Sequence, residues 1–378
     1  MTGAPPDLRP LLLELGASPS PPGHERGVAE RVTDYVGALG LVSVEDDAGS
    51  RIGGNTGNIL VRIEPTVAVG TPIFLCAHLD TVQPEAELRP VVEEGYVRNA
   101  ADTILGADNK AAVAVMLDAV RTVLAQERSQ AGIELLFTPR EETGCDGAKA
   151  FDTSALTAKI GFVFDHAAPI GDIVQTAPFQ TTLDATFTGR KAHAGIAPEE
   201  GRSAIAAAAR AVSELRLGRI DEQTTSNVGL ISGGTARNIV PDRCELTAEA
   251  RSLDETTLRK LVGEMVDSIG FAASVAECEV EIAMEDKYSG YRFAPDDALV
   301  ELGERALRQA GYEPQLVDCG GGADANVFNL VGVPCLNLAN GMAKIHSPDE
   351  EIAVADLEGM REVTLALIDA AATTQVNV

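Results

Sequence analysis

Four short apolar stretches of the sequence run into ionisable side chains of the kinds that bind metals or move protons. They are PIFLCA before His78 and Asp80, IELLFT before Glu141 and Glu142, GFVF before Asp165, and PCLNLA before the loop that holds His346. An HxD spacing places two side chains on the same side of an extended chain, because residues i and i+2 of a strand point the same way. The chemistry therefore depends on whether the fold brings the four stretches together.

The elements that carry these residues read as an α/β unit. Short apolar runs typical of buried strands begin at Asn58, Pro72, Ile133, Gly161 and Pro334, and helical patterns lie between them at about 25–38, 109–126, 296–310 and 356–372. Strands that alternate with helices favour a mainly parallel sheet covered on both faces, a three-layer αβα arrangement. Ligands bind beyond the carboxyl ends of the strands in such sheets, so the ionisable residues are expected at one site.

Asp108 joins this group, because GADNK stands directly before a predicted helix and a carboxylate suits a helix N-terminus. Each residue alone has an ordinary interpretation: Asp108 as a helix cap, Glu141-Glu142 as a solvated acidic pair, a histidine as a packed or solvated side chain. Together they are two imidazoles and at least four carboxylates at one sheet edge, which would repel one another unless cations neutralised them. The combination predicts a cation site.

The middle of the chain follows a different pattern. TLDATFTG, from Thr182, alternates apolar and polar residues; an Ala-rich helix follows from Arg202, then strands near 226–232 and 240–252, a helix at about 254–269 and a strand at about 275–284. This βαββαβ order predicts an α+β domain with an antiparallel sheet, inserted at 179–286 into a discontinuous catalytic domain made of 1–178 and 287–378.

At the level of motifs, the sequence resembles the M20 zinc peptidases, and within them the tripeptidase (peptidase T-like) branch. The matching segments are AHLDTV at 77–82, GADNKAAVA at 106–114, PREETG at 139–144, RKAHAG at 190–195, GGTARNIVPD at 233–242, AEARSLD at 248–254, GGGADANVF at 320–328 and IHSPDE at 345–350. They run in order from about residue 15 to the C-terminus, and they include the inserted domain.

The resemblance implies two divalent ions per subunit, Zn²⁺ or alternatively Co²⁺ or Mn²⁺, bridged by Asp108. His78 and Asp165 would complete one metal site, and Glu142 and His346 the other. Asp80 would orient the His78 ring through its second nitrogen, and Glu141 would be the general base. Relatives also hold the peptide bond after the bridging aspartate in cis, here Asp108–Asn109. His24 and His166 match no ligand position and are interpreted as structural, although His166 stands where relatives have a small or polar residue.

The resemblance also implies roles for the inserted domain, as a lid and as the site of homodimerisation. His193 would reach from the partner subunit to hold the carbonyl oxygen of the substrate, and Asn238 and Arg251 would bind substrate. Arg251 fits a peptide carboxylate, although a surface ion pair is the ordinary alternative. Gly320, Gly321 and Gly322 would let the backbone approach the substrate closely. A dinucleotide loop is a competing interpretation of these glycines, but GGGADA lacks the GxGxxG spacing.

These expectations give a dinuclear metallopeptidase that releases the N-terminal residue of short peptides, tripeptides in particular. A carboxypeptidase or an N-acyl-amino-acid deacylase with the same metal centre is the alternative. A pseudoenzyme scaffold that binds no metal is disfavoured, since every ligand position and Glu141 hold chemically competent residues. A dinucleotide-dependent oxidoreductase is disfavoured by the glycine spacing.

Composition excludes other classes of partner. The 378 residues carry 30 Lys+Arg against 57 Asp+Glu, a net charge of −27, so nucleic acid and anionic membranes would be repelled. We find no apolar run long enough to cross a bilayer and no basic, apolar leader at the N-terminus. The six cysteines are scattered without a CxxC pair, which favours reduced thiols and a cytoplasmic protein, with two domains expected from the length.

Overall fold

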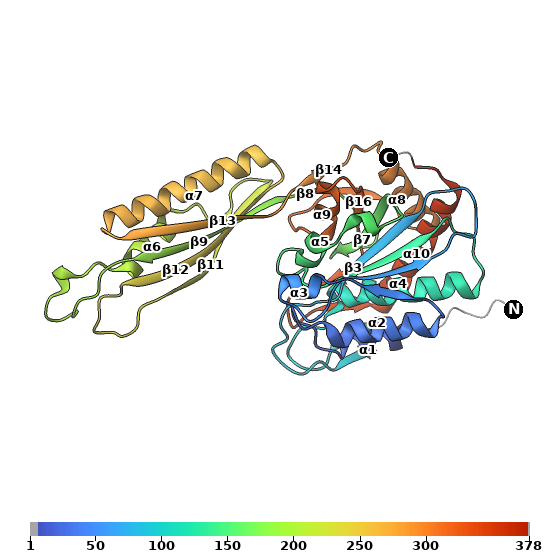
Figure 1. Cartoon of the computed structure of the whole chain (residues 1–378), viewed down its shortest axis with the longest axis horizontal. Coiled ribbons are helices and arrows are strands. Elements are labelled where there is room, and N and C mark those ends of the chain that lie inside the picture. The colour runs from blue at the N-terminus through green and yellow to red at the C-terminus, as the bar shows by residue number, and fades with distance from the viewer. Residues whose placement is uncertain (1–6, 377–378) are drawn as a thin grey trace. The chain divides into compact units, whose positions relative to one another are not determined.

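The computed structural model describes residues 7–376, which form two compact units (Figure 1). Within that range the first unit contains residues 7–176, 292–319 and 323–376. The second unit contains residues 177–291 together with Gly320–Gly322. The chain therefore leaves the first unit after Thr176 and returns to it at Arg292.

The first unit is built on a nine-stranded sheet in the order β1-β2-β6-β3-β7-β16-β8-β14, with β15 paired to β8. Its strands are β1 (Ser43–Glu45), β2 (Ile59–Ile63), β3 (Ile73–His78), β6 (Ile133–Thr138), β7 (Ile160–His166), β8 (Asp172–Ala177), β14 (Tyr291–Arg292), β15 (Gln315–Asp318) and β16 (Cys335–Ala339). The four central strands β6, β3, β7 and β16 are parallel, and antiparallel pairs lie toward both edges. Parallel strands in the middle bring their carboxyl ends to one edge.

Helices cover both faces of this sheet. They are α1 (Arg9–Gly16), α2 (Arg26–Ala38), α3 (Ala48–Ile52), α4 (Ala107–Ala125), α5 (Asp146–Ala150), α8 (Ala298–Gln309), α9 (Asp324–Leu330) and α10 (Val354–Thr373), with a 3-10 turn at Thr153–Ala155. The main core lies between one face and α1, α2, α4, α8 and α10, where Leu75 and Phe162 are fully buried. On the other face Phe74 meets Phe328 of α9 edge to face at 5.1 Å.

A small four-stranded sheet, ordered β17-β18-β5-β4, lies beside the main one in the first unit. Its strands are β4 (Pro90–Glu93), β5 (Tyr96–Asn99), β17 (Met342–Ala343) and β18 (Glu351–Ala353). β18 pairs with β5, so the segment after His346 is tied to a hairpin from the first hundred residues. This sheet was not predicted from the sequence, because strands of two to four residues have no measurable periodicity.

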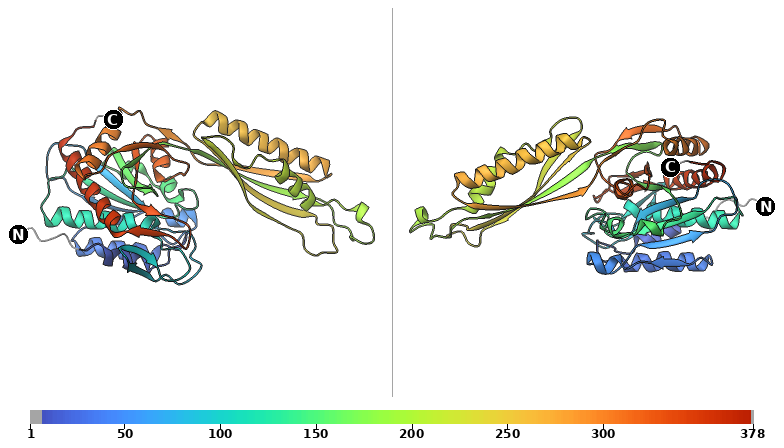
Figure 2. Two further views of the ribbon diagram at one scale, coloured as in Figure 1. Left: turned by 180° about the vertical axis from the view of Figure 1, so that it is seen from behind. Right: turned by 45° about the horizontal axis from the view of Figure 1, so that its top comes forward.

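The second unit is a five-stranded antiparallel sheet, ordered β10-β11-β12-β9-β13, with two helices on one face (Figure 2). Its elements are β9 (Phe179–Thr188), a 3-10 turn (Pro198–Glu200), α6 (Ala204–Glu214), β10 (Gly218–Arg219), β11 (Thr224–Gly233), β12 (Arg243–Ser252), α7 (Glu255–Val275) and β13 (Glu279–Tyr288). Alternate residues of β12 from Cys244 to Ala250 are buried under the helices, and their neighbours face outward.

The predicted fold class is confirmed: a mainly parallel sheet between helical layers, and a separate antiparallel α+β unit in the order βαββαβ with the short β10 added. One boundary was wrong. The last strand of the second unit was expected from about residue 275, yet Val275 is the final residue of α7 and β13 begins at Glu279. The helix continues because Ile269, Ala272 and Ala273 keep its buried stripe in contact with the sheet.

Among the described residues, we find no helix with both the length and the apolar character needed to cross a bilayer. None of the six cysteines, all of which lie within residues 7–376, forms a disulfide.

Candidate metal centre

The ionisable residues that the sequence predicted to form a site in the first unit meet at the carboxyl edge of its sheet. His78 is the last residue of β3, and Asp165 is the last but one of β7. Glu141 and Glu142 lie in the loop after β6, between Arg140 and Cys145, which both have positive φ. These strands are neighbours in the parallel part of the sheet, so their ends converge as the sequence pattern required.

Asp108 stands in the middle of the group and faces a histidine on each side. One of its carboxylate oxygens, Oδ1, is 3.1 Å from Nε2 of His78, and the other, Oδ2, is 3.2 Å from Nε2 of His346. It does not cap the helix that follows, and the Asp108–Asn109 peptide bond is cis, as the resemblance implied. Asp108 therefore belongs to two sets of potential metal ligands at once.

Each set contains one histidine and two carboxylates. In the first, Asp165 lies 3.6 Å from Nε2 of His78, and in the second, Glu142 lies 3.0 Å from Nε2 of His346. The donor atoms of each set, His78–Asp108–Asp165 and Asp108–Glu142–His346, all lie within 4.8 Å of one another. The first set is almost wholly buried, whereas the side chain of His346 is 45% exposed and gives the second set access to solvent.

The histidines and carboxylates of the two ligand sets shift one another's pKa values. Burial alone would lower the pKa of His78, but Asp165, Asp108 and Asp80 outweigh it and raise that pKa well above its ordinary value. Hydrogen bonds to Asp108 and Glu142 raise the pKa of His346 to about 10. Burial, with repulsion from Asp108, raises the pKa of Asp165 to about 8. The carboxylates around His78 and His346 thus favour positive charge at both imidazoles.

The donor set fits two divalent cations. Nitrogen and oxygen donors without a thiolate in either set suit Zn²⁺ and also accept Co²⁺ or Mn²⁺. A carboxylate with its two oxygens turned toward two different histidines is suited to bridging two cations. His78, Asp108 and Asp165 would hold one, and Asp108, Glu142 and His346 the other.

Asp80 supports this site through the backbone. Its two carboxylate oxygens accept the N–H groups of Glu141, at 2.9 Å, and Glu142, at 3.0 Å. Nδ1 of His78 lies closer to the backbone oxygen of Asp80, at 2.9 Å, than to its carboxylate, at 3.5 Å. The HxD pair therefore orients the ring mainly through the main chain, and the Asp80 side chain fixes the loop that carries both glutamates.

Two supporting residues were missed from the sequence. Asn337 of β16 accepts the N–H of Asp165 at 2.9 Å and donates to its carbonyl oxygen at 3.3 Å. Glu350, buried after the His346 loop, accepts the backbone N–H groups of Leu105, Gly106 and Asp108. Glu350 belongs to the IHSPDE segment that resembles the family. For neither Glu350 nor Asn337, however, does a sequence spacing indicate which backbone groups it binds.

Glu141 lies apart from both ligand sets. Its carboxylate accepts the Cys145 thiol at 3.4 Å, and burial, with repulsion from Asp165, raises its pKa well above the ordinary value. Behind them is Asp324, a further missed residue, buried against Thr138 and Cys76. Potential donor atoms of Glu141, Cys145 and Asp324 lie within 4.8 Å of one another. Only the glycines of the GGGADANVF segment at 320–328 were predicted to have a role, whereas Asp324 of the same segment reaches this edge of the sheet.

The predicted residues of the second unit lie on its surface. Nδ1 of His193 accepts the N–H of Gly195 at 3.2 Å, which favours the tautomer with its proton on Nε2. The carbonyl oxygen of Asn238 accepts the N–H of Ala194. Arg251 of β12 pairs with Glu249 at 3.1 Å, the contact expected of a surface ion pair, and it also donates to the carbonyl oxygen of Gly320.

Gly321 and Gly322 follow β15 in the loop before α9. A Cβ at Gly322 would lie 2.1 Å from the ring of Tyr288, so close packing on that ring already requires glycine there. Packing against Tyr288 is therefore a sufficient reason for Gly322, and substrate contact at these glycines stays a prediction.

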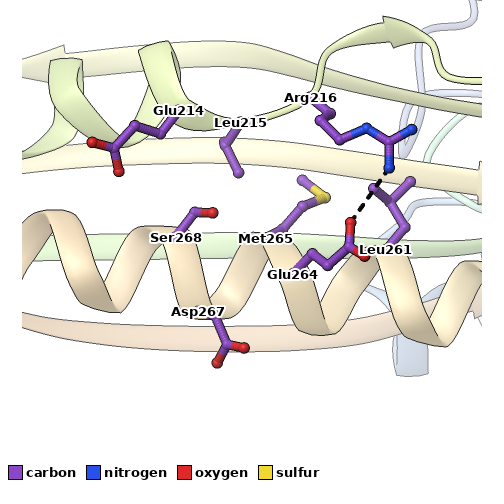
Figure 3. A pocket seen from close by; sticks show the side chains of 8 residues that line it. All are labelled: Glu214, Leu215, Arg216, Leu261, Glu264, Met265, Asp267 and Ser268. Atoms are coloured by element: carbon purple, nitrogen blue, oxygen red, sulfur yellow. Dashed lines mark hydrogen bonds and ion pairs between the residues drawn. The ribbon is translucent and has the colours of Figure 1, made fainter.

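One cavity of the second unit, of about 320 Å³, lies between α7 and the segment after α6 (Figure 3). Leu215 and Met265 line it together with acidic side chains, and Arg216 and Glu264 form an ion pair at 3.5 Å across it. None of the predicted catalytic or substrate residues lines this cavity. It is not part of the candidate site.

Comparison with known proteins finds a matching family and similar relatives. Residues 74–370 match the sequence profile of peptidase family M20/M25/M40. An uncharacterised protein of Bacillus subtilis (strain 168), YqjE, is 38% identical over 360 residues, 95% of this chain and 97% of its own length.

Two solved structures are similar over nearly the whole chain. The aminopeptidase PepT of Bacillus cereus ATCC 10987 has a TM-score of 0.84 and 37% identity, covering 97% of this chain and 98% of its own. A tripeptidase of Staphylococcus aureus (subsp. aureus Mu50) has a TM-score of 0.89 and 34% identity, again over 97% and 98%.

The geometry predicts how cation binding responds to single changes. Wild-type protein should bind two divalent cations per chain, and chelation should remove both. Asp108→Asn should weaken both sites, because Asp108 faces both histidines, whereas His346→Ala should weaken one. Equilibrium dialysis with elemental analysis measures the stoichiometry. Loss of only one cation in Asp108→Asn would contradict the bridging position.

Proposed function

The chain belongs to peptidase family M20/M25/M40, and from this we propose that it is a dinuclear zinc aminopeptidase that releases the N-terminal residue of short peptides, tripeptides above all. The observation that carries the proposal is the pair of ligand sets joined by Asp108. Two relatives above 30% identity over almost the full chain, named as an aminopeptidase and a tripeptidase, support the choice of substrate.

Hydrolysis of a peptide bond requires activation of both reactants, since the amide carbonyl is a poor electrophile and water is a poor nucleophile. Two divalent cations, when bound, supply polarisation of the carbonyl and acidify a water molecule. His78, Asp165, Glu142 and His346 would hold them on either side of Asp108. The exposed side of His346 leaves room for a substrate to approach that set.

Glu141 would move the proton. It is held at the same edge by its backbone N–H to Asp80, and it takes no part in either ligand set. A carboxylate at this position can accept a proton from water and later give it to the leaving amine. Adjacent glutamates can thus divide the work: Glu142 as ligand, Glu141 as base.

The second unit would complete the substrate site. Nε2–H of His193 is a donor suited to an oxyanion, as its Nδ1 is engaged by Gly195. The Arg251 guanidinium has five donors and would bind the peptide's carboxylate beside Glu249, and Asn238 would contribute an amide. The family resemblance further implies that His193 acts on a second copy of the chain.

We therefore propose a homodimer through the second unit, which would also act as a lid. Its sheet ends in β13, a ten-residue edge strand, and Phe271 and Val275 of α7 expose apolar surface that a second copy would cover. A cytoplasmic location is proposed because none of the six cysteines of the described residues forms a disulfide.

Three forms of one peptide test which terminus of the substrate must be free and which residue is released. Tri-alanine with both ends free should be cleaved to alanine and di-alanine; N-acetylation should abolish cleavage because the free amine is required. C-amidation should weaken cleavage through the lost Arg251 contact. Product analysis by mass spectrometry decides. Release of the C-terminal residue from the acetylated peptide would indicate a carboxypeptidase, and release of acetate a deacylase.

Glu141→Gln should lower kcat without loss of metal. The amide keeps the shape of the side chain but cannot accept the proton, and a positioned acid–base group contributes roughly 10²–10⁴-fold. Cation content should stay at two per chain. Full activity would show that another group is the base, and loss of a cation would show that the roles of Glu141 and Glu142 are exchanged.

Mixing two inactive variants tests whether His193 acts across the dimer. Glu141→Gln and His193→Ala are each expected to be nearly inactive. After subunit exchange, one site of each mixed dimer would hold both wild-type residues, so activity should return to at most about half of wild type. An inactive mixture, with exchange verified by native mass spectrometry, would place His193 outside the partner's site.

A further inference from the structure

Glu350 stands out among the buried acids of the first unit, because its partners are backbone groups of a single loop. Oε2 accepts the N–H of Leu105 and of Gly106, each at 2.8 Å, and Oε1 accepts the N–H of Asp108 at 2.9 Å. The side chain is buried, with the residue only 2% exposed. Its carboxylate thus fixes the segment that leads into the bridging Asp108.

The other end of Glu350 is fixed to the His346 loop. Glu350 lies four residues after His346, and its own N–H bonds to the carbonyl oxygen of Ser347. The next residue opens β18, where Glu351 pairs with Arg98 of β5 and with Lys344. The backbone on the His346 side is therefore anchored in the small sheet, and Glu350 connects it to the Asp108 loop.

We propose that Glu350 is a positioning residue that sets the spacing between Asp108 and His346, and so the affinity of the cation held by Asp108, Glu142 and His346. The inference rests on the proposed metal centre. It predicts a larger effect at this set than at the other, because Glu350 joins the segments that carry two of its ligands, Asp108 and His346. The other set shares only Asp108, and its remaining ligands have their own supports: Asn337 holds both backbone groups of Asp165, and the backbone oxygen of Asp80 holds the ring of His78.

Glu350→Gln is the most informative substitution, because it keeps the size of the side chain and removes one hydrogen-bond acceptor. An amide would present an N–H donor to one of the three backbone donors, so at least one hydrogen bond must be lost and the loop must shift. Residues that orient ligands typically contribute about 10–100-fold to metal affinity, and we expect a loss of that order for the cation held by Asp108, Glu142 and His346, with a smaller loss for the other cation. Glu350→Asp keeps the charge and should recover part of the loss.

The readout is cation binding, which does not depend on substrate. Stepwise titration of the apoprotein with Co²⁺, followed by visible absorption and by equilibrium dialysis, gives two affinities and two spectra. His346→Ala identifies the spectrum of the set that Glu350 is proposed to support, and the component lost in Glu350→Gln should be that one. Asn337→Leu, which removes the support of Asp165, should weaken the other component.

Glu134→Gln is a matched control. Glu134 is also a buried carboxylate that accepts two backbone N–H groups, those of Thr157 and Ala158, but it lies near the start of β6 and pairs with Arg62. Its replacement should lower the melting temperature and leave both Co²⁺ affinities unchanged. A general loss of stability is thereby separated from a loss of positioning.

Wild-type Co²⁺ affinities in Glu350→Gln, or an equal loss of both cations, would overturn the inference. If that variant does not fold, Glu350→Asp decides by the same selectivity. Wild-type protein that binds two cations but cleaves no peptide would refute the proposed function and leave the role of Glu350 standing. Wild-type protein that binds no cation would refute both.

Discussion

Crowding of negative charge at one sheet edge is the constraint on which the rest of this structure depends. Asp80, Asp108, Glu141, Glu142, Asp165 and Asp324 are all brought there, three of them buried and three partly buried. Charges of one sign removed from water destabilise a fold unless something compensates them. The protein compensates in two ways. Histidines face the carboxylates that form the ligand sets, and uncharged donors face the others: backbone N–H groups for Asp80, the Cys145 thiol for Glu141 and the Thr138 hydroxyl for Asp324.

Hydrogen bonds to backbone N–H groups connect the segments that carry the ligands. Asp80 binds the backbone of the Glu141–Glu142 loop, Asn337 binds that of Asp165, and Glu350 binds the loop before Asp108. Each link joins a ligand-bearing segment to a different element of the sheet edge. Ligand side chains on loops are thus tied to neighbouring elements, and such ties orient the ligands of a metal site.

The parts of the site that the sequence could predict are those that depend on local pattern. Apolar runs ending in His78, Glu141 and Asp165 indicated buried parallel strands, and the rule that such strands share a carboxyl edge was enough to gather the candidates. Glu350 and Asn337 could not be found this way, since their partners are 242 and 172 residues distant and no spacing encodes them. The fold class was predictable for the same reason, whereas the end of α7 was not: whether Ala272 and Ala273 continue a helix depends on the sheet beneath them.

The insertion of the second unit between Thr176 and Arg292 has a consequence for biosynthesis. When the ribosome has completed residue 176, the chain already contains His78, Asp108, Glu142 and Asp165, but β16, His346 and Glu350 are still to come. The second unit is contiguous except for three glycines, so it can fold as it emerges, because domains generally fold as units in the order of synthesis. The first unit must wait for its central strand β16, which lies between β7 and β8. A nascent chain stalled before residue 335 would therefore expose a half-built acidic edge, and the mature site can form only once the last segment has been released.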